Sequence, residues 1–212
     1  MPASTPRILV PAALLVAFAW LLGGCATDPS KLDPNRSYFE GGELRDPEPT
    51  TIVLTGRVLK SQGRVEEAEY ILRRAVVEYP EFPPAYVELA ELLLKDGRSN
   101  EAIVLLKNGL RDCPGDAMMH NDLGMCFVVT EDFDAASASF SRARELDRED
   151  AAYTANLAMV RALQGRYDEA VLLYREVIPA AEAHGNVAIL AESRGDLERA
   201  ESDRAIAAQL PR

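Results

Sequence analysis

One spacing recurs along this chain and restricts the folds that it can adopt. Alanines stand 34 residues apart at Ala68, Ala102, Ala136 and Ala170, and Ala200 follows 30 residues later. A second series in the same register runs through Gly63, Gly97, Glu131, Gly165 and Gly195. A period of roughly 20 to 50 residues is the sequence signature of a solenoid, in which each unit packs only on its neighbours. Two independent series in one register therefore predict an array of repeats.

Each unit has the pattern of a helix, a short turn at the glycine and a second helix. In the fourth unit, Leu157 and Ala158 lie on the first helix and Gly165 supplies the turn. Ala170 then lets the second helix approach, because two helices cannot close to about 8 Å across bulky side chains. Alanine and leucine dominate an apolar fraction of 48%, with only 7% aromatic residues, which favours closely packed helices over a sheet.

This arrangement resembles the tetratricopeptide repeat family over residues 49–210. The resemblance implies an all-α fold, a right-handed superhelix (an α-solenoid) of about five helix-turn-helix repeats. We place the repeats at residues 49–82, 83–116, 117–150, 151–180 and 181–210. In the third unit, Glu131 replaces the turn glycine and Arg148 replaces the closing proline found at Pro80 and Pro114. In the fifth, Arg204 occupies a position that normally packs on a following unit, so we expect this unit to be a cap.

The segment before the repeats has the features of an export signal. Residues 1–24 contain Arg7, no acidic residue and an apolar run of about 15 residues, which is shorter than the roughly 20 of a transmembrane helix. The sequence Leu-Gly-Gly-Cys at residues 22–25 resembles a bacterial lipobox, which implies cleavage after residue 24 and lipidation of Cys25. An ordinary secretory signal is the alternative.

The residues after Cys25 predict where the chain is attached and how. Acyl chains such as palmitate on Cys25 would give a stable membrane anchor, because two acyl chains attach a protein stably whereas a single chain gives only marginal membrane binding. Ala26, where an aspartate favours the inner membrane, implies an outer membrane lipoprotein of the bacterial cell envelope that faces the periplasm. Residues 25–48 contain Asp-Pro three times and a Gly-Gly pair, so we expect a disordered, flexible linker between the lipidated cysteine and the repeats.

Charge and residue types argue against several function classes. With 34 acidic and 23 basic side chains, the net charge of −11 repels phosphate backbones, so nucleic acid is not expected as a partner. The only histidines, His120 and His184, occupy equivalent positions on first helices and are expected to pack there. We find no nucleophile elbow, phosphate-binding loop or metal-ligand spacing. We therefore expect no enzyme activity, cofactor, metal or small-molecule substrate.

Two cysteines remain if Cys25 is lipidated. Cys113 closes the second unit and Cys126 lies within the first helix of the third. An exported protein can form disulfides, but the rise of about 1.5 Å per helical residue separates these positions. We predict two free thiols, with a bridge as the alternative.

The resemblance also implies a binding surface, because first helices line a concave groove in this family. The expected groove residues are Val53, Arg57, Val87, Glu91, Met118, Asn121, Met125, Ala155 and Met159. The middle of this set is apolar and carries three methionines, which adapt to varied partners. The groove therefore predicts capture of an amphipathic helix or an extended hydrophobic peptide. A clamp for a terminal carboxylate is not expected, because the matching positions are mostly apolar or acidic.

The lipobox, linker and repeats together resemble pilotin and Tad-type pilus assembly lipoproteins. We therefore favour a membrane-anchored scaffold that binds protein partners and helps to assemble an envelope-spanning machine of the pilus or secretion type. The alternative is an adaptor that recruits periplasmic proteases or cell-wall hydrolases to the membrane.

Overall fold

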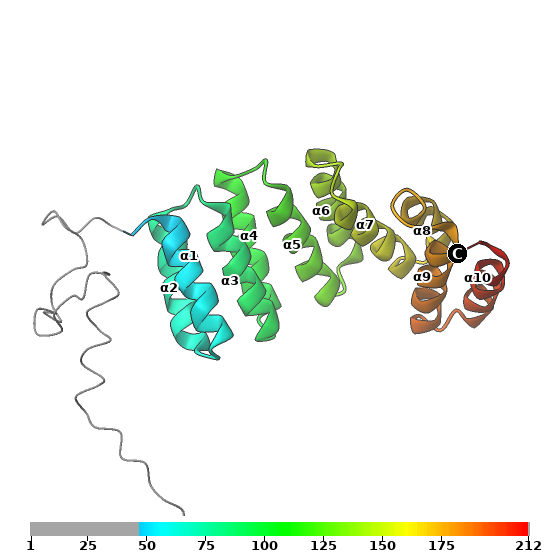
Figure 1. Cartoon of the computed structure of the whole chain (residues 1–212), viewed down its shortest axis with the longest axis horizontal. Coiled ribbons are helices and arrows are strands. Elements are labelled where there is room, and N and C mark those ends of the chain that lie inside the picture. Colours follow the sequence, from blue (N-terminus) through cyan, green and yellow to red (C-terminus); the bar gives the residue numbers. More distant parts are fainter. Residues whose placement is uncertain (1–46, 212) are drawn as a thin grey trace, which may run out of the picture. The chain divides into compact units, whose positions relative to one another are not determined.

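The computed structural model of the protein describes residues 47–211, and these residues form ten α-helices without a strand (Figure 1). The helices are α1 (Pro49–Ser61), α2 (Val65–Glu78), α3 (Pro83–Lys95), α4 (Ser99–Asp112), α5 (Ala117–Val129), α6 (Phe133–Leu146), α7 (Ala151–Leu163), α8 (Tyr167–Tyr174), α9 (Ala180–Ser193) and α10 (Leu197–Gln209). The predicted all-α solenoid of helix pairs is confirmed. The predicted signal peptide, Cys25 and the linker up to residue 46 lie outside the described residues.

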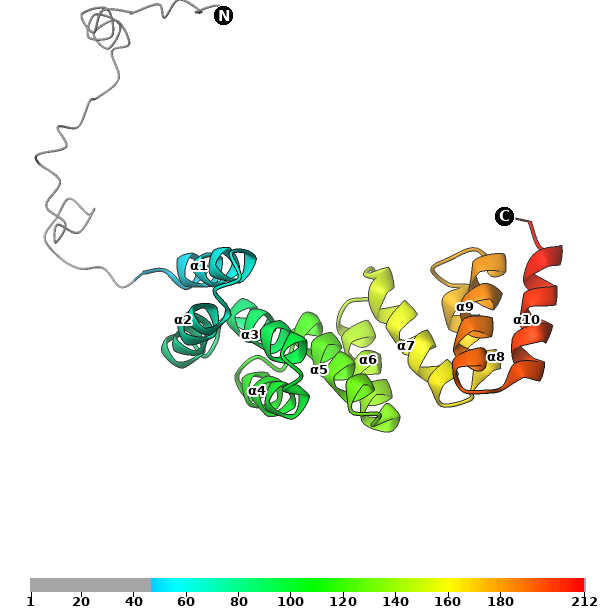
Figure 2. The same ribbon diagram turned by 90° about the horizontal axis from the view of Figure 1, so that it is seen from below.

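Consecutive helices pack as five pairs, and the pairs follow one another along residues 47–211 (Figure 2). The first helices contact each other from α1 to α3 and from α3 to α5, and again from α7 to α9. Each second helix also contacts the first helix of the next pair, as α2 does with α3 and α4 with α5. The described residues therefore form two layers, one of first helices and one of second helices.

The turn within each pair depends on a left-handed backbone conformation. The turn glycines have positive φ angles, for example 75° at Gly97 and 79° at Gly165, which only a residue without a Cβ adopts at little cost. Glu131 has the same conformation with a φ of 60°. The packing of the helix pair therefore imposes the left-handed turn in the third unit, although the Glu131 side chain disfavours that conformation.

The buried apolar residues form two clusters. The first extends from α1 to α7 and contains large side chains such as Leu72, Leu106 and Phe140, all 0% exposed. The second involves α7 to α10 and consists mostly of alanine, with Val187 and Tyr174 as larger members. One helix, α7, contributes to both clusters and joins them.

Close packing explains a glycine that the turns do not need. An added Cβ at Gly124 of α5 would lie 2.6 Å from the Phe140 ring of α6. The small residue at this position thus lets the two helices of the third unit approach.

The fourth unit departs from the others in its second helix. Helix α8 has 8 residues, whereas α2, α4 and α6 have 14 each. The fourth unit is four residues shorter than the period of 34, and a turn and bend at residues 175–178 follow α8 where the longer second helices continue.

Both cysteines of the described region are free thiols, as predicted. Cys126 is buried in the first cluster, and burial raises the pKa of its thiol to about 12. None of the helices within residues 47–211 is long and apolar enough to span a bilayer.

Candidate functional site on the first helices

The predicted groove residues lie on α1, α3, α5 and α7, and we call this side of the molecule the first-helix face. A hydrogen bond of 2.8 Å from Asn156 Nδ2 of α7 to Asn121 Oδ1 of α5 extends the row of contacts between first helices. The face has a charged part on α1 and α3 and a mixed part on α5 and α7.

The charged part is an ion-pair network between the first two units. Glu88 accepts hydrogen bonds from Arg57 Nε at 2.5 Å and from Lys60 Nζ at 2.8 Å. Lys60 also reaches Glu91 at 2.6 Å, and Lys95 lies 2.7 Å from the other oxygen of Glu91. Burial alone would lower the pKa of Lys60, but the hydrogen bonds to the two glutamates outweigh it and raise that pKa. Arg57 and Glu91 are therefore held by this network.

The mixed part combines methionines with amides. Met118 is 53% exposed, while Met125 is half-buried against the first cluster. Ala155 and Met159 of α7 are half-buried against the second cluster. Flexible thioether side chains at the edges of two cores can adjust to an incoming apolar surface.

Asp122 lies beside these methionines and was not among the predicted residues. Its Oδ1 accepts a hydrogen bond of 3.3 Å from Asn121, and no ion pair holds it among residues 47–211. Burial raises the pKa of Asp122 to about 6, the Asn121 hydrogen bond opposes this, and the negative charges of Glu91, Asp116 and Glu88 add to it. The carboxyl group therefore changes charge close to neutral pH.

One predicted position differs from the expectation of accessible apolar surface. Val53 is only 3% exposed and belongs to the first cluster, so its side chain cannot line an accessible surface. Val87 is half-buried against the same cluster. Glu88, only 7% exposed, and Asp122 were missed, although their spacing of 34 residues shows that they share one register position.

Both histidines have packing or hydrogen-bonding roles. His184 Nδ1 lies 2.6 Å from Asp203 Oδ1, and Arg199 Nε donates to the other oxygen of Asp203 at 2.5 Å. Asp203 is 0% exposed, so this triad lies inside the fifth unit. A ring nitrogen of His120 lies 3.2 Å from the carbonyl oxygen of Pro114. Over residues 47–211, no group of three or more His, Cys, Asp or Glu side chains is placed to hold a metal ion.

The fold and its turns define a tetratricopeptide-type repeat domain, and comparison with known proteins agrees. Residues 18–202 match the family model described as the Cilia and flagella-associated protein 70 C-terminal domain, a tetratricopeptide repeat model, so the chain belongs to the tetratricopeptide repeat family. The TPR repeat-containing protein PA4299 of Pseudomonas aeruginosa is 27% identical over 196 residues, which cover 78% of this chain and 80% of that protein. Anaphase-promoting complex subunit 7 of Mus musculus is 30% identical over 101 residues, but these cover only 18% of its length.

Solved structures share the fold at low sequence identity. A crystal structure of MamA protein superposes with a TM-score of 0.61 and 22% identity, covering 76% of this chain and 90% of that one. The structure of YrrB, described as a TPR protein with an unusual peptide-binding site, gives a TM-score of 0.58 at 22% identity and covers 74% and 84%. This likeness establishes the repeat fold, which serves widely as a scaffold for protein interactions.

Proposed function

We propose that this protein is a membrane-anchored scaffold that binds a segment of a partner protein on its first-helix face. The observation that carries the proposal is the mixed part of that face, where Met118 and Met125 lie one turn to either side of Asn121 and Asp122 on α5. Met159 lies one turn after Asn156 on α7, and Asn156 donates to Asn121. Methionine supplies adaptable apolar contact and the polar groups supply direction, a combination typical of peptide-binding surfaces. The peptide-binding site named for YrrB supports this use of the fold.

The finer part of the proposal is the role of the complex. We propose that lipidated Cys25 holds the scaffold at the outer membrane, where it helps to assemble an envelope-spanning machine of the pilus or secretion type. The lipobox and the linker support this role, together with the likeness to a bacterial repeat protein of similar length.

The test is co-purification from the native bacterium after chemical cross-linking. The full chain with Met118→Glu and Met125→Glu should lose its cross-linked partner, because two charges replace apolar contacts at the centre of the face. Val104→Glu is the matched control, since Val104 is 58% exposed on α4 and lies on the second-helix layer. Equal partner recovery from both proteins would refute binding on the first helices.

The identity of the recovered proteins tests the role. Secretin or pilus components support an assembly factor, whereas proteases or cell-wall hydrolases would support the adaptor instead. Mass spectrometry of the N-terminal peptide tests the lipid anchor. Cys25→Ser is the control, because it removes the thiol that receives the lipid. An unlipidated Cys25 in the wild-type peptide would contradict the anchor.

A further inference from the structure

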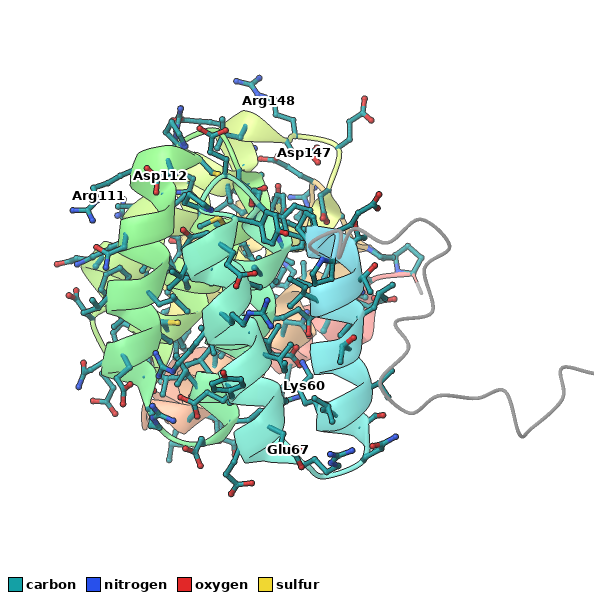
Figure 3. The ribbon with its side chains drawn as sticks, turned by 90° about the vertical axis from the view of Figure 1, so that its left-hand side faces the viewer. Lys60, Glu67, Arg111, Asp112, Asp147 and Arg148 are labelled. Atoms are coloured by element: carbon teal, nitrogen blue, oxygen red, sulfur yellow. The ribbon has the colours of Figure 1, made fainter. Side chains whose placement is uncertain are left out.

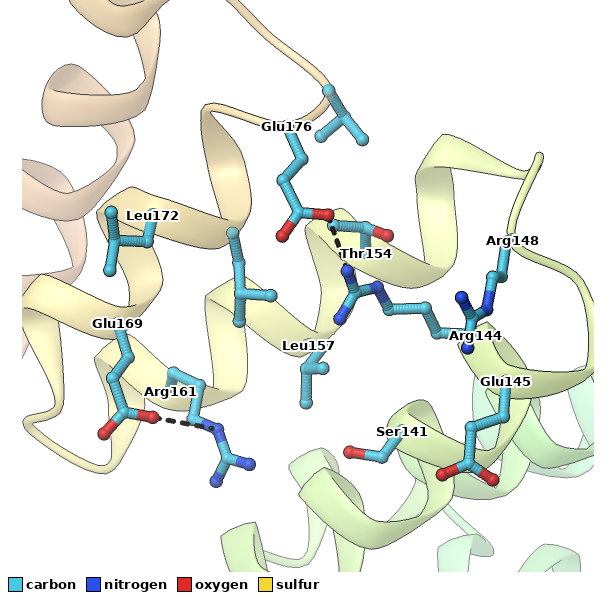
Figure 4. Close-up of a pocket in the computed structure, with 12 residues that line it drawn as sticks. Ser141, Arg144, Glu145, Arg148, Thr154, Leu157, Arg161, Glu169, Leu172 and Glu176 are labelled. Atoms are coloured by element: carbon cyan, nitrogen blue, oxygen red, sulfur yellow. Dashed lines mark hydrogen bonds and ion pairs between the residues drawn. The ribbon is translucent and has the colours of Figure 1, made fainter.

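A cleft of about 770 Å³ lies at the junction of the third and fourth units, away from the residues of the first-helix face (Figure 4). Its wall is formed by α6, α7 and α8, and apolar side chains on it come from Leu157, Leu172, Leu173 and Val177. Helix α8 is the short one, so the second helix that would cover this junction ends early. The volume is in the range of about 300–1,000 Å³ that binding pockets have.

Three arginines border the cleft at positions that the preceding units give to apolar residues. Arg161 occupies the position at which the first three units have buried apolar residues, 34 residues apart: Leu59, Leu93 and Phe127. Arg144 replaces Val76 and Leu110, both of which pack against the first cluster. Arg148 replaces Pro80 and Pro114. These replacements come from two helices and a loop, yet all three side chains border one cleft.

Three arginines and three glutamates border the cleft, and they differ in how they are paired. Arg144 is held by Glu176 at 2.5 Å, and Glu145 by Arg142 at 3.1 Å. Arg161 is only 20% exposed, and its nearest carboxylate, on Glu169, is 3.8 Å away. Arg148 makes no ion pair with any other residue of the described range. Each carboxylate at the rim therefore has an arginine partner, that of Glu169 being Arg166 at 2.6 Å. Within residues 47–211, Arg148 has no carboxylate partner, and Arg161 donates to the neutral Gln164 at 3.1 Å but has no carboxylate within hydrogen-bond distance.

From this arrangement we propose that the cleft is a second docking site, which binds an acidic segment of a partner protein. One carboxylate of that segment pairs with Arg148 and a second with Arg161, which lie apart on the cleft, and an apolar side chain between them packs on Leu157 and Leu173 (Figure 4). Arginine suits this role because its planar guanidinium donates two parallel hydrogen bonds to a carboxylate. The selectivity for acidic segments rests on Arg148 and Arg161, the two arginines of the cleft without a close carboxylate, in a chain whose net charge is −11.

The test uses the full chain in detergent and a fluorescent peptide of alternating glutamate and leucine, followed by fluorescence anisotropy. We expect binding that weakens with salt and that falls at least tenfold when glutamine replaces every glutamate, because charged hydrogen bonds are lost. Arg161→Leu, which restores the residue type of the earlier units, and Arg148→Ala should each weaken binding about tenfold.

The matched control is Arg111→Ala. Arg111 is exposed at the same end of the helices as Arg148, but it does not border the cleft (Figure 3). Its variant should bind the peptide as the wild type does. Thermal melts of Arg161→Leu followed by circular dichroism show whether the variant is folded, so that a loss of binding is not mistaken for unfolding.

Three results would overturn the proposal. One is equal binding of the glutamate and glutamine peptides, and another is full binding by Arg148→Ala and Arg161→Leu. The third is a wild-type dimer in light scattering that both variants dissociate, because a second copy of the chain would then occupy the cleft.

Discussion

The first and second hydrophobic clusters belong to the same kind of repeat but are built from different side chains. In the first, one register position of the second helix holds Leu72, Leu106 and Phe140, all fully buried. In the second, the equivalent position of the fourth unit holds Tyr174, 6% exposed. Next to this cluster, the fifth unit buries Asp203 in a triad with His184 and Arg199 at a position where the second unit has Leu105. Small residues and left-handed turns therefore preserve the helix pairs, while the side chains between them can be apolar or ionic.

The largest effect should come from emptying the first cluster. Phe140→Ala removes a ring that is 0% exposed and fills the space above Gly124, so the free energy of unfolding should fall by about 3–5 kcal/mol. Urea denaturation of the full chain followed by circular dichroism measures it. Leu172→Ala, at a side chain that is 62% exposed, is the control and should cost less than about 1 kcal/mol. A similar loss in both variants would mean that the first cluster is not the main source of stability.

Breaking the triad probes the second cluster. Asp203→Ala removes the buried acceptor of His184 and one of the two carboxylates that hold Arg199, which keeps Asp168 at 2.8 Å, so it should destabilise the fifth unit by about 2 kcal/mol. Hydrogen exchange would locate the loss to α9 and α10. The double variant Asp203→Leu with His184→Tyr restores the residue types of Leu105 and Tyr86, and its stability should return to within about 1 kcal/mol of the wild type. Failure of this apolar replacement would show that the ionic filling is required.

The first-helix face predicts a dependence on pH. The pKa of Asp122 is about 6 in the folded chain and near 3.8 when unfolded, so between these values the folded state binds more protons. This contribution therefore makes the chain more stable as pH falls from 7 to 4, by about 1–3 kcal/mol. Urea titrations of the wild type and Asp122→Asn isolate it, since the amide has no such dependence. Parallel pH curves for the two proteins would contradict the assignment.

The smallest effect concerns the turns. Glu131→Gly removes a side chain from a residue with a φ of 60°, so it should stabilise the third unit by about 1 kcal/mol. Gly97→Ala, at a φ of 75°, is the reciprocal change and should destabilise the second unit by a similar amount. Thermal melts measure both, and a loss of stability in Glu131→Gly would indicate that the glutamate makes a compensating contact.

The repeat register accounts for what could be predicted from the sequence. It indicated the helix pairs and their turns, including the irregular one at Glu131, because helix period and turn geometry are local properties. It was wrong about Val53, whose burial depends on how α1 packs against its neighbours. It missed Asp122 because the cost of an unpaired carboxylate depends on neighbours from other helices. Arg148 stood out as a departure, but its shared cleft with Arg161 required the arrangement of three helices.

The shared helix α7 has a consequence for cooperativity. Leu157 and Val160 face one cluster while Ala158 and Ala162 face the other, so α7 is the main link between the two clusters, supported by Leu173 of α8, which packs against both. Fraying that starts at α10 can proceed through the second cluster and stop at α7 with the first three units still folded. A scaffold divided in this way can exchange its C-terminal end between ordered and open forms while its methionine-bearing units keep their shape.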